Sequence, residues 1–316
     1  MKKFLLRLLL CAIFLAVLYF FLARNLSWHE IAKGLHRLSW LAIFGALLLS
    51  FVISCLKALR FYLLVKKAGL SLSFGRALRL FFASQAASPL PAGETVRGAL
   101  LVHETQSSTV EASGPVVAQA FLEIIAALGI VLAGSFYFEI FRKAAVILAV
   151  IVSALLFLFV HPKLLRRILE KPASWSWAEA RVKSILHAQE QVSKLLLPKP
   201  RHGLFTFSII GLAFLADIVG GLLILFLAVQ LGAPLSFGGS IFIYAMSVGI
   251  QGLCAVIPGG LGVTEGGMLG ILRLWEVPFS LAVPLVMVFR LLTLIFTVVL
   301  GLLILSIFYS KKWMKL

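Results

Sequence analysis

The chain has 316 residues, of which 61% are hydrophobic and 13% charged, and its mean hydropathy is +1.07. A soluble domain would carry about twice that charged fraction, so the composition excludes an ordinary soluble protein and predicts a polytopic membrane protein. The formal net charge of +17 does not indicate nucleic-acid binding. The basic residues flank apolar stretches, where they set topology and attract anionic lipid. The cysteine spacing indicates no disulfide framework, and neither a metal nor a cofactor is expected.

Six apolar stretches are predicted to span a bilayer, which takes about 20 residues of helix. In chain order they are about 4–23, 39–62, 114–135, 143–160, 203–230 and 279–309. We interpret the first as an uncleaved span rather than a signal peptide, because its apolar run is longer than the usual signal core. Residues 27–38 are expected to form a short amphipathic surface helix.

Two further apolar segments, 74–104 and 237–275, are broken by proline and glycine. Each begins within the same four residues, Leu-Ser-Phe-Gly, found at 72–75 and again at 235–238. The offset between the copies is 163 residues there (235 − 72) and 167 at the breaks (258 − 91). The chain therefore contains two copies of one unit. Paired breaks at matching positions of two halves indicate a transporter-type binding site. The residues expected to form the breaks are Pro91, Gly93, Pro258, Gly259 and Gly260.

Charge placement predicts the orientation. Basic residues cluster near both termini, in the polar stretch 161–202 and after the second span, where they are Lys57, Arg60, Lys66, Lys67, Arg76 and Arg79. These clusters share one side of the membrane if each broken segment returns to its side of entry, and the positive-inside rule makes that side cytoplasmic. The protein is expected to be integral to the cytoplasmic (inner) membrane, with both termini on the cytoplasmic side. The stretch 161–202 is expected to be an amphipathic link on the cytoplasmic leaflet.

The predicted fold class is an all-α polytopic membrane protein, with six transmembrane helices plus two re-entrant helical hairpins in an inverted repeat. Residues 1–316 are expected to form a single integral membrane domain. Repeat 1 covers about 39–135 and repeat 2 about 203–309. The alternative is that each broken segment crosses the membrane once, which would make the repeats parallel. Irregular backbone at membrane depth needs protein or a wet cavity around it, which favours two facing hairpins.

Two motifs resemble those of the lysylphosphatidylglycerol synthase transmembrane, or flippase-like, family. Residues 89–102, PLPAGETVRGALLV, resemble its Gly-Glu-x-x-Arg signature, and residues 257–265, IPGGLGVTE, resemble its Pro-Gly-Gly-x-Gly-x-x-Glu hallmark. The first motif departs from the family pattern, because Leu90-Pro91-Ala92 stands where many members carry an Arg. The resemblance implies a stand-alone lipid translocase, since the polar stretch 161–202 is too short for the family's soluble aminoacyl-transferase domain. It implies membrane lipids with anionic or glycosylated headgroups as partners, without fixing the lipid.

Seven residues are candidates for a substrate site. Glu94 and Arg97 follow the first break, where helix amides and a guanidinium could hold a phosphate. Capping of the helix is the alternative role for Glu94. Glu265 follows the second break, where a structural hydrogen bond closing the hairpin is the alternative. The seven candidates are Glu94, Arg97, Glu123, Asp217, Thr264, Glu265 and Arg290.

Three of these candidates, Glu123, Asp217 and Arg290, lie near the middle of predicted spans. An ionisable group at that depth marks a site or pairs with another ionisable group. The offset of 167 relates Arg290 to Glu123 (290 − 167 = 123). Glu123 is therefore the first expected partner of Arg290, ahead of Asp217 and Glu265. Asp217 has no charged repeat counterpart and is a candidate for carrying a proton.

The predicted function is that of a lipid flippase working through a central polar cavity. The alternatives are an intramembrane transferase or accessory protein acting on lipid-linked substrates, and a non-transporting membrane scaffold. No catalytic residue is assigned, because His103-Glu104 is the only pair that suggests catalysis and a solvated helix end explains it equally well. Assembly into a homo-oligomer is left open.

Overall fold

The computed structural model describes residues 36, 38–90, 93–161, 164, 167, 186, 189–193, 195–196, 203–253, 260 and 262–313. The predicted first span, nearly all of the predicted surface helix and much of the link lie outside the described residues. So do Pro91, Pro258 and Gly259 of the two breaks.

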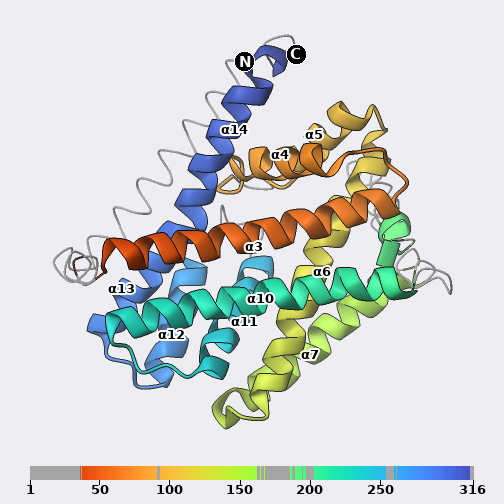
Figure 1. The fold of residues 1–316 in the computed structure, drawn as a ribbon. Coiled ribbons are helices and arrows are strands. Elements are labelled where there is room, and N and C mark those ends of the chain that lie inside the picture. Colours follow the sequence, from red (N-terminus) through yellow and green to blue (C-terminus); the bar gives the residue numbers. More distant parts are fainter. Residues whose placement is uncertain are drawn as a thin grey trace.

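The described residues form helices joined by short turns (Figure 1). This confirms the all-helical prediction. The helices are α3 (Trp40–Lys67), α4 (Phe74–Gln85), α5 (Thr95–Thr105), α6 (Thr109–Ser135), α7 (Glu139–Val160), α10 (Gly203–Leu231), α11 (Phe237–Leu253), α12 (Val263–Leu274), α13 (Phe279–Arg290), a π-helical turn (Leu291–Ile295) and α14 (Phe296–Trp313).

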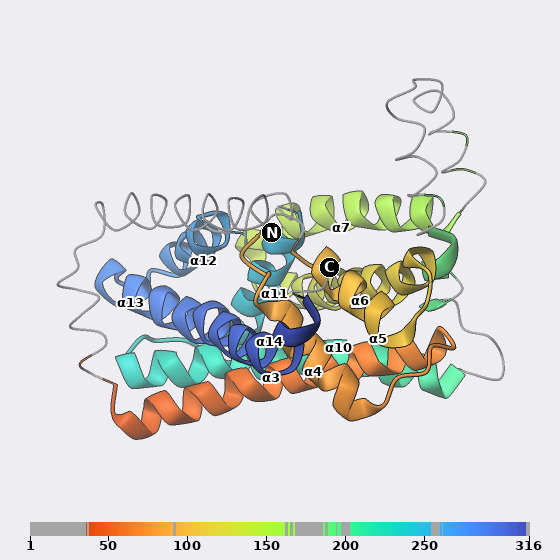
Figure 2. The same ribbon diagram turned by 90° about the horizontal axis from the view of Figure 1, so that it is seen from above.

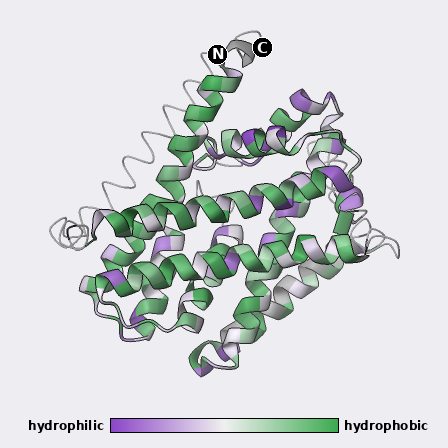
Figure 3. Ribbon diagram, viewed as in Figure 1, coloured by the Kyte–Doolittle hydropathy of each residue, from purple (hydrophilic) through white to green (hydrophobic). Residues whose placement is uncertain are grey.

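Four of these helical stretches are long and apolar enough to cross a membrane: α3, α6, α10 and the continuous stretch Phe279–Tyr309. They coincide with the predicted second, third, fifth and sixth spans, and α7 lies where the fourth was expected. Apolar residues run along α3, α10 and α14 (Figure 3). Many large apolar side chains are exposed, such as those of Phe44, Leu204 and Leu303. A water-soluble protein rarely exposes so much apolar surface, whereas a bilayer requires it.

Local side-chain hydrogen bonds set where the long helices begin. Ser39 precedes α3, and its hydroxyl accepts a hydrogen bond from the N–H of Ala42 at 3.1 Å. Ser108 and Glu111 form a reciprocal capping box at the start of α6. Each satisfies amide groups that a first helical turn leaves without a partner. Lys66 and Lys67 occupy the last turn of α3, where their charge complements the helix dipole.

In each half of the chain a long helix is followed by two shorter helices and a second long helical stretch, which in the second half is Phe279–Tyr309 and begins with α13. The starts of α3 and α10 are 163 residues apart (203 − 40), and those of α4 and α11 are also 163 apart (237 − 74). The starts of α5 and α12 differ by 168 (263 − 95), and those of α6 and α13 by 170 (279 − 109). The helices α3 and α10 pack side by side and run in opposite directions (Figures 1 and 2).

The broken segments are pairs of short helices. They contain 12 and 11 residues in α4 and α5, and 17 and 12 in α11 and α12. At 1.5 Å per residue none reaches the ~30 Å of a bilayer core. Glycine is required at both breaks. A Cβ on Gly93 would lie 1.8 Å from the Ala87 carbonyl oxygen, and Gly260 and Gly262 have φ of 63° and 82°. The re-entrant path of these segments stays a prediction.

One tertiary hydrogen bond joins α3 to the π-helical turn, and one apolar cluster joins the link to α3. Ser50 on α3 donates a hydrogen bond of 2.8 Å to the Leu292 carbonyl in the π-helical turn, where the regular helical bonding pattern changes. In the described part of the link, Val192 and Leu195 are buried in one apolar cluster with Leu64. That part of the link therefore packs on the helix bundle.

Candidate functional site

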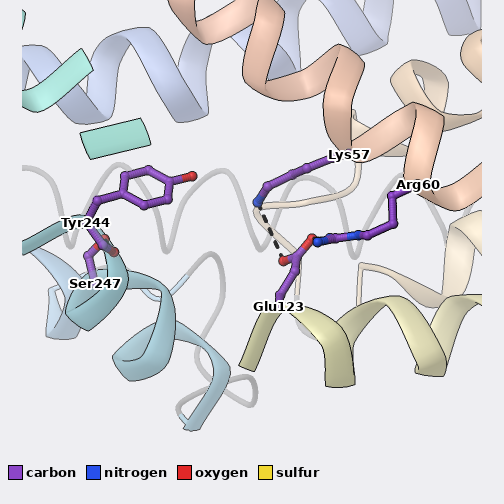
Figure 4. Close-up of polar contacts among 5 residues, drawn as sticks. All are labelled: Lys57, Arg60, Glu123, Tyr244 and Ser247. Atoms are coloured by element: carbon purple, nitrogen blue, oxygen red, sulfur yellow. Dashed lines mark hydrogen bonds and ion pairs between the residues drawn. The ribbon is translucent and has the colours of Figure 1, made fainter. Parts of the chain in front are cut away.

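Three charged side chains meet inside the bundle, between α3 and α6. The ammonium group of Lys57 lies 3.5 Å from one carboxylate oxygen of Glu123, and the guanidinium of Arg60 donates to the other (Figure 4). Lys57 and Arg60 are three residues apart on α3, so they share one face of the helix. Arg60 is 1% exposed, which places its charge in the protein interior.

Two more ionisable groups, Arg97 and Asp217, interact electrostatically with these side chains and extend the group to other helices. The charge of Arg97 on α5 acts on Glu123 along with those of Lys57 and Arg60. The charges of Lys57 and Glu123 act in turn on Asp217, a buried residue of α10. We call Lys57, Arg60, Arg97, Glu123 and Asp217 the central cluster. With every member ionised it carries three positive and two negative charges, a net charge of +1.

Tyr244 on α11 lies beside Lys57 of the central cluster (Figure 4). Its hydroxyl points toward Lys57, and the hydroxyl of Ser247 donates to its backbone carbonyl at 2.7 Å (Figure 4). The ring packs directly over Gly220 of α10, where an added Cβ would lie 2.2 Å from ring carbons. The absence of a side chain at this glycine therefore allows α10 and α11 to approach closely.

Arg97 is held from two directions. Its Nε donates to the Ser84 hydroxyl at 3.1 Å, and its guanidinium carbon lies 4.6 Å from the centre of the Phe81 ring and 5.7 Å from that of Phe61. Cation–π contact stabilises a guanidinium at such distances. Glu94, by contrast, is exposed just before α5 and its side chain makes no capping hydrogen bond. The structure therefore does not bring Glu94 into the central cluster.

A second ion pair lies at the other break. Arg290 donates from Nε to Glu265 at 2.5 Å, and the other oxygen of Glu265 accepts the N–H of Gly262 at 2.7 Å. The expectation that Glu123 is the first partner of Arg290 is therefore wrong. Glu265 pairs with it because α12 packs against α13, whereas Glu123 is engaged by two cations of α3. Glu265 also takes the structural role considered for it, capping the first turn of α12.

Thr264 and Gly260 lie together at the second break. A Cβ on Gly260 would come 2.6 Å from the Thr264 hydroxyl, which is buried and makes no hydrogen bond. Across the described residues, no three His, Cys, Asp or Glu side chains are grouped so that they could hold a metal ion.

The sequence interpretation missed Lys57 and Arg60 as members of an internal site. They were assigned to the basic cluster that follows the second span, but α3 continues through Lys67 and both residues lie within it. The available signal was their position inside the predicted span 39–62, three residues apart. Tyr244 and Ser84 were also missed, because nothing in their spacing distinguishes them from ordinary core residues.

The sequence profile of the lysylphosphatidylglycerol synthase TM region matches residues 5–301 of the chain. The chain belongs to this family. No curated protein matched the chain in a separate sequence comparison. Membership in the lysylphosphatidylglycerol synthase TM family, together with the four apolar helices, indicates an integral membrane protein related to lipid handling.

Proposed function

We propose that this protein moves an anionic lipid between the two leaflets, and that the central cluster binds the lipid headgroup on its way. The observation that carries the proposal is the excess of positive charge inside the bundle, where Arg60 and Arg97 are buried and Lys57 is partly buried. Lys57, Arg60 and Arg97 gather around one paired carboxylate, Glu123. A phosphate is the natural counter-charge, because guanidinium groups bind it through two parallel hydrogen bonds.

The depth of the cluster supports transport rather than surface binding. Glu123 is the fifteenth residue of the 27 in α6 (123 − 108), and Asp217 is the fifteenth of the 29 in α10 (217 − 202). Both therefore lie at the middle of helices long enough to span. Charges at this depth are costly, and they are characteristic of substrate and ion pathways.

In this proposal the two breaks form the path that the lipid headgroup follows across the membrane. The paired short helices α4–α5 and α11–α12 would enter from opposite sides as re-entrant hairpins of an inverted repeat. The antiparallel packing of α3 and α10 supports that arrangement. The basic ends of α3 and of the chain would then face the cytoplasm of an inner membrane.

Translocation in reconstituted vesicles tests the function. Fluorescent short-chain phosphatidylglycerol and phosphatidylcholine are compared, and the fraction of probe reaching the opposite leaflet is followed by chemical quenching. We expect faster transfer of the anionic probe. Arg60→Gln should abolish that preference, whereas the control Arg142→Gln, at an exposed ion pair of α7, should keep it. Equal rates for protein-free and protein-containing vesicles would refute the proposal.

A further inference from the structure

The carboxyl group of Asp217 is the one member of the central cluster without a hydrogen-bonded partner. The residue is 2% exposed, and its Oδ2 is buried and makes no hydrogen bond. The nearby cations are already engaged, since both Lys57 and Arg60 contact Glu123. A headgroup site needs cations and gains nothing from this acidic group, so anion binding alone leaves Asp217 unexplained.

The surroundings of Asp217 contain few groups that could neutralise it. Its helix, α10, packs mainly against α3, α11, α13 and α6. The charges that act on it are those of Lys57 and Arg60 from α3 and that of Glu123 from α6. Tyr244 is the titratable residue of α11, and Arg290 of α13 donates to Glu265.

Burial favours the neutral form of such a group. A carboxylate removed from water without hydrogen-bond donors is strongly disfavoured, and it binds a proton instead. An ionised Asp217 would need Lys57 as its counter-charge. In the structure that ammonium group lies beside Glu123, so the two carboxyl groups compete for one cation.

We propose that Asp217 is a proton-binding site, and that its ionised form competes with an anionic headgroup for Lys57. This inference rests on the proposed function for the identity of the anion. Protonation converts the carboxylate to the neutral acid and raises the net charge of the central cluster from +1 (3 − 2) to +2 (3 − 1). A headgroup with one negative charge then returns it to +1. Headgroup binding is therefore linked to the uptake of one proton, which would supply the coupling ion for transport.

Infrared spectroscopy of the purified full chain tests the proton site without any lipid substrate. We expect a carbonyl band of a buried protonated carboxyl group in neutral buffer, which disappears in alkaline buffer. Asp217→Asn should remove the band, and Glu139→Gln, at an exposed position on α7, should leave it unchanged. The absence of the band in the wild type, or its survival in Asp217→Asn, would overturn the inference.

Glu123→Gln keeps the test decisive even where Asp217→Asn fails to fold. Removing the Glu123 charge leaves Lys57 to Asp217 alone, so Asp217 should ionise and the band should be lost in neutral buffer. A band unchanged by Glu123→Gln would show that the two carboxyl groups do not share Lys57, and would contradict the inference.

The pH dependence of lipid binding tests the linkage itself. Phosphatidylglycerol affinity of the wild type should weaken as pH rises through the titration of Asp217, by up to about tenfold per pH unit for one linked proton. Asp217→Asn should show no such change. Strong binding that is independent of pH would refute the linkage and leave the proposed function intact. Failure of the wild type to bind the lipid would refute the proposed function, while the infrared result would still decide the proton site.

Discussion

Replacing Glu265 with Gln should destabilise the protein strongly, because it removes the carboxylate to which Arg290 donates. Both side chains are almost fully buried, with 6% of Glu265 and 11% of Arg290 exposed, and their atoms lie 2.5 Å apart. Breaking a buried pair by removing one partner costs about 3–5 kcal/mol. Gln can still accept the N–H of Gly262, so most of this loss comes from the ion pair rather than from the helix cap.

The assay is a double-mutant cycle on the free energy of unfolding, measured by titrating SDS into detergent micelles. Arg290→Gln alone should also be costly, and the double variant should recover about 1–3 kcal/mol relative to the sum of the two single losses. Arg273→Gln is the matched control, since Arg273 is exposed on the same helix, α12, and its loss should stay within about 0.5 kcal/mol. Strictly additive losses would show that Glu265 and Arg290 do not interact directly. Another group would then have to neutralise Arg290.

Three further predictions concern two packing contacts and the membrane topology. Gly220→Ala should cost about 1–3 kcal/mol by forcing the tyrosine ring of α11 away, whereas Gly211→Ala, with open space around it on the same helix, should be near neutral in the same unfolding assay. Ser50→Ala should cost roughly 1 kcal/mol, because it leaves a carbonyl of the π-helical turn without its donor, and a loss near zero would show that the bond contributes nothing. Single cysteines at Ser88 and Thr105 should react with a membrane-impermeant reagent from one side only, and labelling from opposite sides would mean that the first broken segment crosses the membrane.

The succession of helices could be predicted from the sequence because its determinants are local. Apolar length sets the spans, and glycine and proline set the breaks. The repeat of Leu-Ser-Phe-Gly at 72–75 and 235–238 therefore anticipated α4 and α11, both of which begin inside it. The starts of α3 and α10 are separated by the same 163 residues as the two copies of Leu-Ser-Phe-Gly.

The charge pairing could not be predicted, because it depends on which helices touch. A repeat offset relates equivalent positions, and equivalence between Glu123 and Arg290 does not place them in contact. Charges near the end of an apolar run also suggest topology signals, so Lys57 was assigned to the membrane surface. Only the packing of α6 against α3 shows that it neutralises a partly buried carboxylate. Likewise, the sequence does not show that the ring of Phe81 and the hydroxyl of Ser84 hold the Arg97 side chain, and the binding of a phosphate by Arg97 stays a prediction.

The most direct test asks whether an anionic headgroup reaches the central cluster. A phosphatidylglycerol with a photoactivatable group on its headgroup is incorporated into vesicles with the full chain, irradiated, and the cross-linked peptides are identified by mass spectrometry. We predict cross-links on the buried middle of the bundle, around Lys57, Glu123 and Asp217, that disappear in Arg60→Gln and that a matched phosphatidylcholine probe does not give. Cross-links confined to outward-facing positions such as Leu204 and Phe207, alike for both lipids, would contradict headgroup binding at the central cluster.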